Sequence, residues 1–164
     1  MKTIQRQWAG FAIFFLVTGM CVQGKAQSFN RKEFYAVMGS ANLKNVDGQI
    51  NILKTSGVAG KQAFEGALLM KKAALVKGPS KKLGLFKQGH KKLEAAIAAD
   101  EDNGEYRFLR LMIQENAPGI LGYKNDLDKD SAYLRQSFKK LPTDVQQAIT
   151  DYSKTSKALR TEDF

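Results

Sequence analysis

The residues in this sequence whose type and spacing most clearly suggest a binding function are lysines, which are concentrated between residues 61 and 92. Residues 27–92 contain 13 basic and 3 acidic side chains, whereas residues 93–164 contain 10 basic and 13 acidic ones. A lysine ammonium attracts carboxylates and phosphates, so such a surface favours an anionic partner. Lysine is also common on any solvated helix face, and this second interpretation stays open. The candidate binding residues are Lys71, Lys72, Lys77, Lys81, Lys82, Lys87, Lys91 and Lys92.

Three carboxylates at alternate positions, Asp126, Asp128 and Asp130, are spaced like the start of a calcium-binding loop. A loop of that type requires glycine at its sixth position and a bidentate glutamate at its twelfth. Counted from Asp126, these positions hold Ser131 and Ser137, so the pattern does not predict a metal site. The helix dipole favours aspartate in the first turn of a helix, and we expect this role here.

The sequence contains no recognisable arrangement of catalytic groups. His90 is the only histidine, and Glu94 would be an isolated second metal ligand at best. Glu105 and Glu115 point to different sides of one helical segment, so they do not form an acid–base pair in a cleft. No serine or threonine lies in a nucleophile elbow, and no glycine pattern fits a phosphate-binding loop. We therefore expect a protein that is not an enzyme and holds no cofactor or metal ion.

The elements that must position these residues begin after an expected signal peptide, residues 1–26. A short cationic stretch precedes an apolar run over residues 9–17, which is too short to span a bilayer. Small residues predict cleavage after Ala26, which would leave residues 27–164 in the periplasm or outside the cell, with no transmembrane segment. Cys21 could mark a lipoprotein instead, but the bulky residue before it fits that processing poorly. After cleavage no cysteine remains for disulfides, thiol catalysis or metal binding.

Residues 27–164 have the pattern of a single all-α domain. Apolar residues recur at helical spacing, turn residues separate the segments, and no β-hairpin signal is present. We expect an antiparallel array of about six helices, arranged as helical hairpins of tetratricopeptide-like or bundle type. The candidate helices cover residues 31–38, 49–56, 60–77, 80–100, 105–117, 126–141 and 143–158, with a turn at residues 45–48.

Contacts between these helices follow from their short connections. The expected pairs are 49–56 with 60–77, 80–100 with 105–117, and 126–141 with 143–158. Thr143 to Gln146 matches a capping box at the start of the last helix, and residues beyond Leu159 are expected to fray.

The segment 105–117 is apolar on more than one side, which predicts the central element of the core. Arg107 and Arg110 lie on or near its less apolar side, where we expect them to pair with Glu115 or with the acidic turn at residues 100–102. The connector that follows, Ile120 to Tyr123, is expected to pack back onto the helices.

Lys71 falls near the middle of an apolar stripe that includes Phe64, Ala67, Leu68 and Leu75. Either its side chain extends past the stripe to solvent, or the stripe is an exposed amphipathic surface.

Two resemblances follow from particular runs of residues. Residues 86–113 resemble one junction between tetratricopeptide repeats, through Phe86, Gly89, Leu93, Ala96–Ile97, Asp100 to Asn103, Tyr106 and Leu109. Residues 80–159 resemble a segment of uncharacterised short exported helical proteins of Bacteroidetes-type bacteria, through Glu105 to Arg110, Ile113 to Pro118 and Leu121 to Tyr123. The second resemblance implies export and an all-α fold, and it implies no mechanism.

These observations favour a protein-interaction or structural module of the cell envelope, with another envelope protein as its partner. The alternative is a peripheral binder of anionic lipid or glycan, acting through the lysines of residues 61–92. Only the second kind of binding should weaken steeply with salt. Nucleic acid is not expected as a partner, because export would separate the protein from nucleic acid in the cytosol. The lysine run also has few aromatic residues for base stacking. The sequence sets no oligomeric state.

Overall fold

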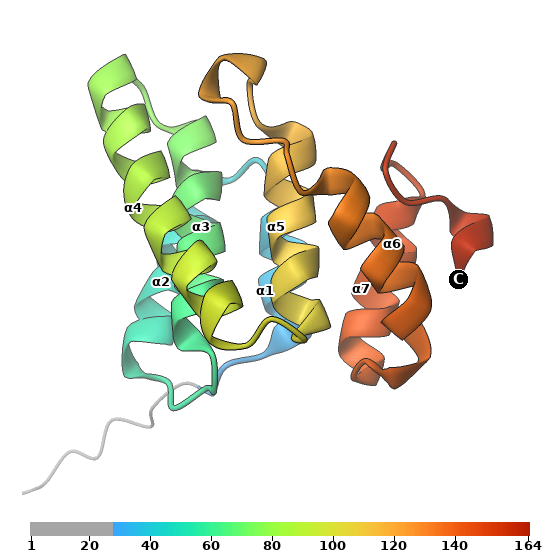
Figure 1. Cartoon of the computed structure of the whole chain (residues 1–164). Helices are drawn as coiled ribbons and strands as arrows, with labels where there is room; N and C mark the ends of the chain where they lie inside the picture. Colours follow the sequence, from blue (N-terminus) through green and yellow to red (C-terminus); the bar gives the residue numbers. More distant parts are fainter. Residues whose placement is uncertain (1–27) are drawn as a thin grey trace, which may run out of the picture.

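The computed structural model describes residues 28–164, which form seven α-helices and no strand (Figure 1). The all-α prediction is therefore confirmed, whereas the expected signal peptide, with Cys21, lies outside the described residues. The α-helices are α1 (Arg31–Gly39), α2 (Leu43–Thr55), α3 (Lys61–Leu75), α4 (Pro79–Ala99), α5 (Gly104–Asn116), α6 (Leu127–Ser137) and α7 (Thr143–Ser153). Three short 3₁₀ helices accompany them: η1 (Gly119–Leu121), η2 (Phe138–Lys140) and η3 (Thr161–Asp163).

Asparagine side chains begin three of the helices. Asn30, Asn42 and Asn103 each accept a hydrogen bond, 3.2 Å long, from the backbone N–H three residues later. Asparagine is among the best N-cap residues because its side-chain oxygen satisfies one of the free N–H groups of the first turn. Since Asn42 caps α2, this helix begins at Leu43, and the turn that we predicted at residues 45–48 is wrong.

The start of α7 also differs from the prediction. Pro142 occupies the N-cap position, and no side chain caps the helix there. Gln146, the expected second half of the capping box, instead donates a hydrogen bond to the carbonyl oxygen of Leu141 at 2.7 Å. The capping box is wrong because Thr143 is already the first helical residue.

The most extensive helix contact joins α3 to α4. A Cβ atom added to Gly66 would lie 2.8 Å from the carbonyl oxygen of Gly89, and one added to Gly89 would lie 2.5 Å from that of Gly66. The two backbones therefore touch at a crossing where only glycine fits. This contact explains why α4 packs mainly on α3. The predicted contact of α4 with α5 is also present, but it is smaller.

Helix α5 is the centre of the core, as the sequence predicted. Every residue from Gly104 to Gln114 is buried, and α5 contacts α3, α4 and α6. The predicted pair of α2 with α3 is confirmed. The predicted pair of α6 with α7 is not a main contact, because α6 packs on α5 and α7 packs on α1.

Buried apolar side chains from all seven α-helices form one continuous core. Phe34, Phe64 and Phe108 are its largest fully buried members. None of the helices within residues 28–164 combines the length and the apolar character needed to span a bilayer.

The C-terminal segment is packed, although we expected residues beyond Leu159 to fray. Leu159 is fully buried, and the ring of Phe164 lies 4.7 Å from that of Phe138 between centroids. Asp163 forms an ion pair with Arg135 at 2.9 Å. Apolar burial and this pair together hold the segment against α6 and η2.

Candidate binding groove

An apolar groove opens at the end of the molecule where the α3–α4 turn and η1 lie, uppermost in Figure 1. Its volume is about 720 Å³, within the range of about 300–1,000 Å³ that is usual for small-molecule sites. Its walls come from the C-terminal ends of α1, α3, α5 and α7, the N-terminal half of α4, and η1. Apolar atoms make up most of the exposed lining.

Three methionines line this groove, and they are all the methionines within residues 28–164. Met38, Met70 and Met112 come from α1, α3 and α5, and each is almost fully buried. Methionine side chains are unbranched and flexible, so they adapt to ligands of varied shape. Together with Phe86 and Ile113 they form a wall that suits a flexible apolar group better than a hydroxyl-rich sugar.

The rim of the groove includes the two large apolar side chains that residues 28–164 expose to solvent. Ile120 in η1 is 95% exposed, and Leu83 on α4 is 44% exposed. Single exposed apolar side chains are ordinary, but two on the rim of one apolar groove indicate a surface for apolar contact. Gly122 ends η1 with φ +61°, a left-handed conformation that favours glycine, and so fixes the path of the connector that presents Ile120.

Lys71 and Lys82 are the charged side chains that line the groove. Lys71 is half-buried, and this burial lowers its pKa from the ordinary value. Phe64 and Leu68, members of the apolar stripe around Lys71, are fully buried. The stripe is therefore a core face rather than an exposed amphipathic surface, and Lys71 extends past it into the groove.

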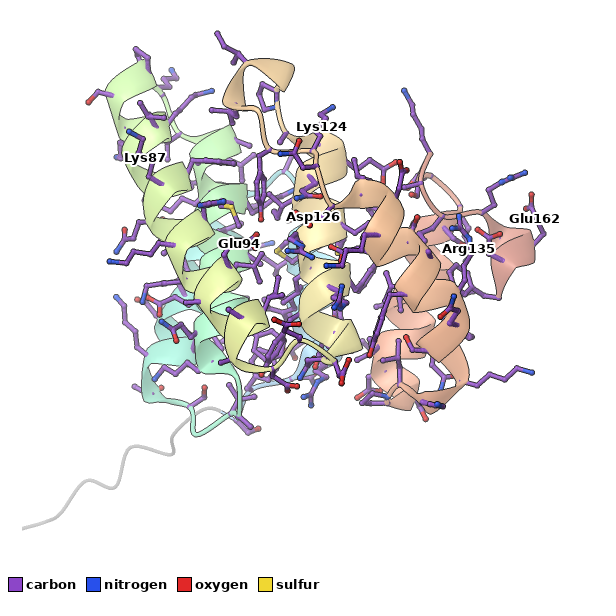
Figure 2. All side chains as sticks on the ribbon, viewed as in Figure 1. Lys87, Glu94, Lys124, Asp126, Arg135 and Glu162 are labelled. Atoms are coloured by element: carbon purple, nitrogen blue, oxygen red, sulfur yellow. The ribbon has the colours of Figure 1, made fainter. Side chains whose placement is uncertain are left out.

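The other predicted lysines are not gathered at this site. Lys72 forms an ion pair with Asp47 at 2.5 Å, and Lys92 forms one with Glu65 at 3.1 Å. Lys87, labelled in Figure 2, lines a second cavity described below. Exposed positions that line neither cavity hold Lys77, Lys81 and Lys91.

The second, smaller cavity has a volume of about 340 Å³ and shares Leu83, Phe86 and Leu121 with the groove. His90 lies here, with its ring centroid 4.7 Å from that of Tyr123. The histidine therefore packs among aromatic rings. No group of three metal-ligating side chains that could hold an ion occurs within residues 28–164.

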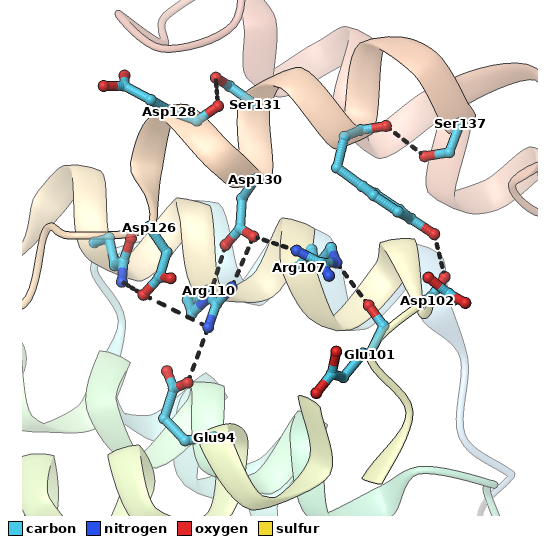
Figure 3. A network of polar contacts seen from close by, with 12 residues as sticks. Glu94, Glu101, Asp102, Arg107, Arg110, Asp126, Asp128, Asp130, Ser131 and Ser137 are labelled. Carbon is cyan, nitrogen blue, oxygen red and sulfur yellow. Dashed lines mark hydrogen bonds and ion pairs between the residues drawn. The ribbon is translucent and has the colours of Figure 1, made fainter. Parts of the chain in front are cut away.

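A buried ionic cluster joins α5 to α6 (Figure 3). Asp130 is fully buried, and it accepts hydrogen bonds from Arg107 at 3.2 Å and from Arg110 at 2.7 and 2.8 Å. Burial disfavours the charged form of Arg110, but the bonds from this arginine to Asp130 and its attraction to nearby carboxylates outweigh that effect and raise its pKa. Asp130 thus lies in the first turn of α6, as predicted, and is also the buried counter-ion of two arginines.

Our expected partners for these arginines were only partly right. Arg107 reaches the predicted acidic turn, where it donates to the carbonyl oxygen of Glu101 at 2.7 Å. Arg110 pairs with Glu94 on α4 at 3.0 Å in addition to Asp130, as Figure 3 shows. Glu115 takes no part, because its carboxylate accepts hydrogen bonds from Tyr152 and from the segment after α7. The cluster satisfies its own charges, so it serves the fold rather than a ligand.

Glu94 also positions the connector after α5. The buried hydroxyl of Tyr123 donates a hydrogen bond to Glu94, and burial together with this bond raises the pKa of Tyr123. The predicted packing of residues 120–123 is therefore right for Tyr123 and wrong for Ile120, which faces solvent. The connector is anchored at one end and open at the groove.

Glu115 instead holds the segment after α7. It accepts hydrogen bonds from the Tyr152 and Ser156 hydroxyl groups, both at 2.8 Å, and from the backbone N–H groups of Lys157 and Ala158. Partial burial opposes the charged form of Glu115, but these hydrogen bonds outweigh it and hold the pKa of this carboxyl below its ordinary value. This cluster borders the groove, since Tyr152 also lines it.

In comparisons with known proteins, no family model, no curated protein and no solved structure matches the chain. Its function is therefore inferred from the geometry of the chain itself.

The sequence revealed the lysines of the groove but not its apolar walls. In the candidate helix at residues 80–100, the sequence predicts an apolar face that consists of Leu85, Phe86, Gly89, Leu93, Ala96 and Ile97. Leu83 lies outside this face, and Ile120 lies in a connector between a proline–glycine pair and Gly122. Apolar residues in such places were the signals that could have identified the rim. Met38 and Met112 belong to separate core faces in the sequence, and only the meeting of four helix ends brings them together.

Proposed function

We propose that this chain is an exported, non-enzymatic binding protein that holds the apolar part of a small amphipathic molecule in the groove. The observation that carries this proposal is the groove, a cavity of about 720 Å³ lined by three methionines and rimmed by Leu83 and Ile120. Small-molecule sites are typically concave and mostly apolar, with a few polar groups that fix the orientation of the ligand.

A protein partner, the first expectation from the sequence, receives less support from this geometry. A helix that docks in a groove inserts a row of apolar anchors at positions i, i+3, i+4 and i+7, which needs an extended apolar surface. Within residues 28–164 only two large apolar side chains, Leu83 and Ile120, are exposed to solvent. The alternative expectation, an anionic lipid, agrees better with the groove, because Lys71 and Lys82 belong to the predicted lysine series and line it.

The test is a titration of the purified protein with N-phenyl-1-naphthylamine, an uncharged probe whose fluorescence rises in apolar sites. Ala74 is an exposed residue of α3 that lines the groove, so Ala74→Trp should occupy part of the cavity and weaken probe binding by about tenfold or more. Ala132→Trp, at an exposed position of α6 outside the groove, is the matched control and should bind like the wild type.

Circular dichroism and thermal unfolding establish that both variants are folded. Failure of the wild type to bind the probe, or equal binding by the wild type and the folded Ala74→Trp variant, would contradict the proposal.

A further inference from the structure

We infer that the ligand of this groove is a single-chain fatty acid whose carboxylate pairs with Lys71 and Lys82. This inference rests on the proposed function and adds to it the chemistry of the ligand's two ends.

The charge of the groove has one sign. Lys71 and Lys82 line it, and no aspartate or glutamate does. Within residues 28–164 neither lysine forms a salt bridge, although Lys72 and Lys92 from the same two helices both do. The two groove lysines are therefore available to an anion from outside the chain.

Of the two lysines, Lys71 is the one whose charged form such an anion would stabilise more. Its side chain is half-buried, and partial burial of an ammonium disfavours the charged form unless a negative group compensates. The other polar side chains at the site are already occupied: Asn116 donates to the Tyr152 hydroxyl at 3.0 Å, and Thr155 donates to the Tyr152 carbonyl at 3.3 Å. The lysines remain as the groups that could orient a ligand.

The walls favour one flexible alkyl chain. Met38, Met70 and Met112 come from three different helices, and such side chains rearrange around a chain with many rotatable bonds. A volume of about 720 Å³ places the site among those for single small molecules. A fatty acid offers the required combination, an apolar chain that ends in one negative charge.

The test measures displacement of N-phenyl-1-naphthylamine by dodecanoate, by dodecanol and by dodecyltrimethylammonium, all below their micelle-forming concentrations. These probes share one chain length and differ in the charge of the headgroup. The wild type should bind dodecanoate about tenfold more tightly than dodecanol, since a hydrogen bond to a charged group is worth that factor or more. It should bind the cationic probe most weakly.

Variants assign the preference to the two lysines. Lys71→Met and Lys82→Met should each lower the ratio of dodecanoate affinity to dodecanol affinity, whereas Lys71→Arg should retain this ratio. Lys77→Met removes an exposed lysine outside the groove and is the matched control. Affinity within a carboxylate series should rise by up to about fourfold for each added CH₂ group until the cavity is full.

Three results would overturn the inference. Equal affinity of the wild type for dodecanol and dodecanoate would contradict the role of the carboxylate, but it would not contradict the proposed function. If the probe binds but no alkyl compound displaces it, the inference of an alkyl-chain ligand is wrong as well, and the proposed function is again not contradicted. Salt-sensitive sedimentation with phosphatidylglycerol vesicles, unchanged by Ala74→Trp, would assign the lysines to a membrane surface instead.

Discussion

Gly66 and Gly89 bring the backbones of α3 and α4 into direct contact. A Cβ atom on Gly66 would also meet the backbone nitrogen of Leu93 at 2.8 Å, and one on Gly89 would meet Cγ of Met70 at 2.8 Å. Because Met70 lines the groove, this crossing fixes one of the groove walls as well as the helix pair.

Alanine at either glycine should therefore destabilise the protein. Gly66→Ala and Gly89→Ala should each lower the free energy of unfolding by about 1–3 kcal/mol, because the clash with backbone atoms exceeds the helix propensity gained. Gly84→Ala is the matched control, since it lies in α4 with no atom within 4 Å of the added Cβ. That variant should gain up to about 1 kcal/mol. Urea unfolding measures all three, and a Gly89→Ala variant as stable as the wild type would contradict the crossing.

Asp130 should be essential to the stability of the α5–α6 contact. Asp130→Asn removes the buried charge that neutralises Arg107 and Arg110, at an expected cost of about 3 kcal/mol. The loss stays at the lower end of the usual range because Arg110 keeps Glu94. Asp128→Asn changes an exposed aspartate in the same turn and should cost less than about 0.5 kcal/mol. Similar unfolding free energies for the two variants would show that the cluster contributes little.

Glu115 should make stability depend on pH in the acidic range. The pKa of Glu115 is lower in the folded protein than its ordinary value of 4.5, so its carboxylate stabilises the fold above that value. This contribution should be lost as the pH falls below about 4.5 and through the lower pKa of the folded state. The difference in unfolding free energy between wild type and Glu115→Gln should therefore be larger at pH 7 than at pH 3. A difference that is independent of pH would contradict this role.

The packed C-terminal segment gives a further prediction. Leu159→Ala removes a fully buried side chain and should lower the free energy of unfolding by about 2–5 kcal/mol. Lys157→Ala, at an exposed position two residues earlier, should change it by less than about 0.5 kcal/mol. Thermal unfolding distinguishes them, and a negligible effect of Leu159→Ala would contradict the packing of Leu159 in the core.

Local patterns in the sequence predicted the helices but only some of the contacts between them. The apolar sides of residues 105–117 correctly identified the central helix, because a helix that is buried on several sides has apolar residues on several sides. Gly89 was predicted on an apolar face, yet its contact with Gly66 depends on a crossing that no periodicity encodes. Asp130 was placed in the correct helical turn, but its arginine partners lie 20 and 23 residues away in the chain.

The candidate site, too, could be predicted only in part from the sequence. Lys71 stood out in the sequence because a charge interrupts an apolar stripe, and it does line the groove. Ile120 did not, because nothing in a short connector indicates which of its apolar residues will face solvent.

The two cavities lie next to each other and share three lining residues. Leu83, Phe86 and Leu121 border both the space of about 720 Å³ and the space of about 340 Å³, and Phe86 has the largest side chain of the three. If the proposed ligand binds in the larger space, we expect a smaller residue at position 86 to let its alkyl chain extend toward His90, which lines the smaller one. Chain-length selectivity in this protein would then be set by the size of a single aromatic ring.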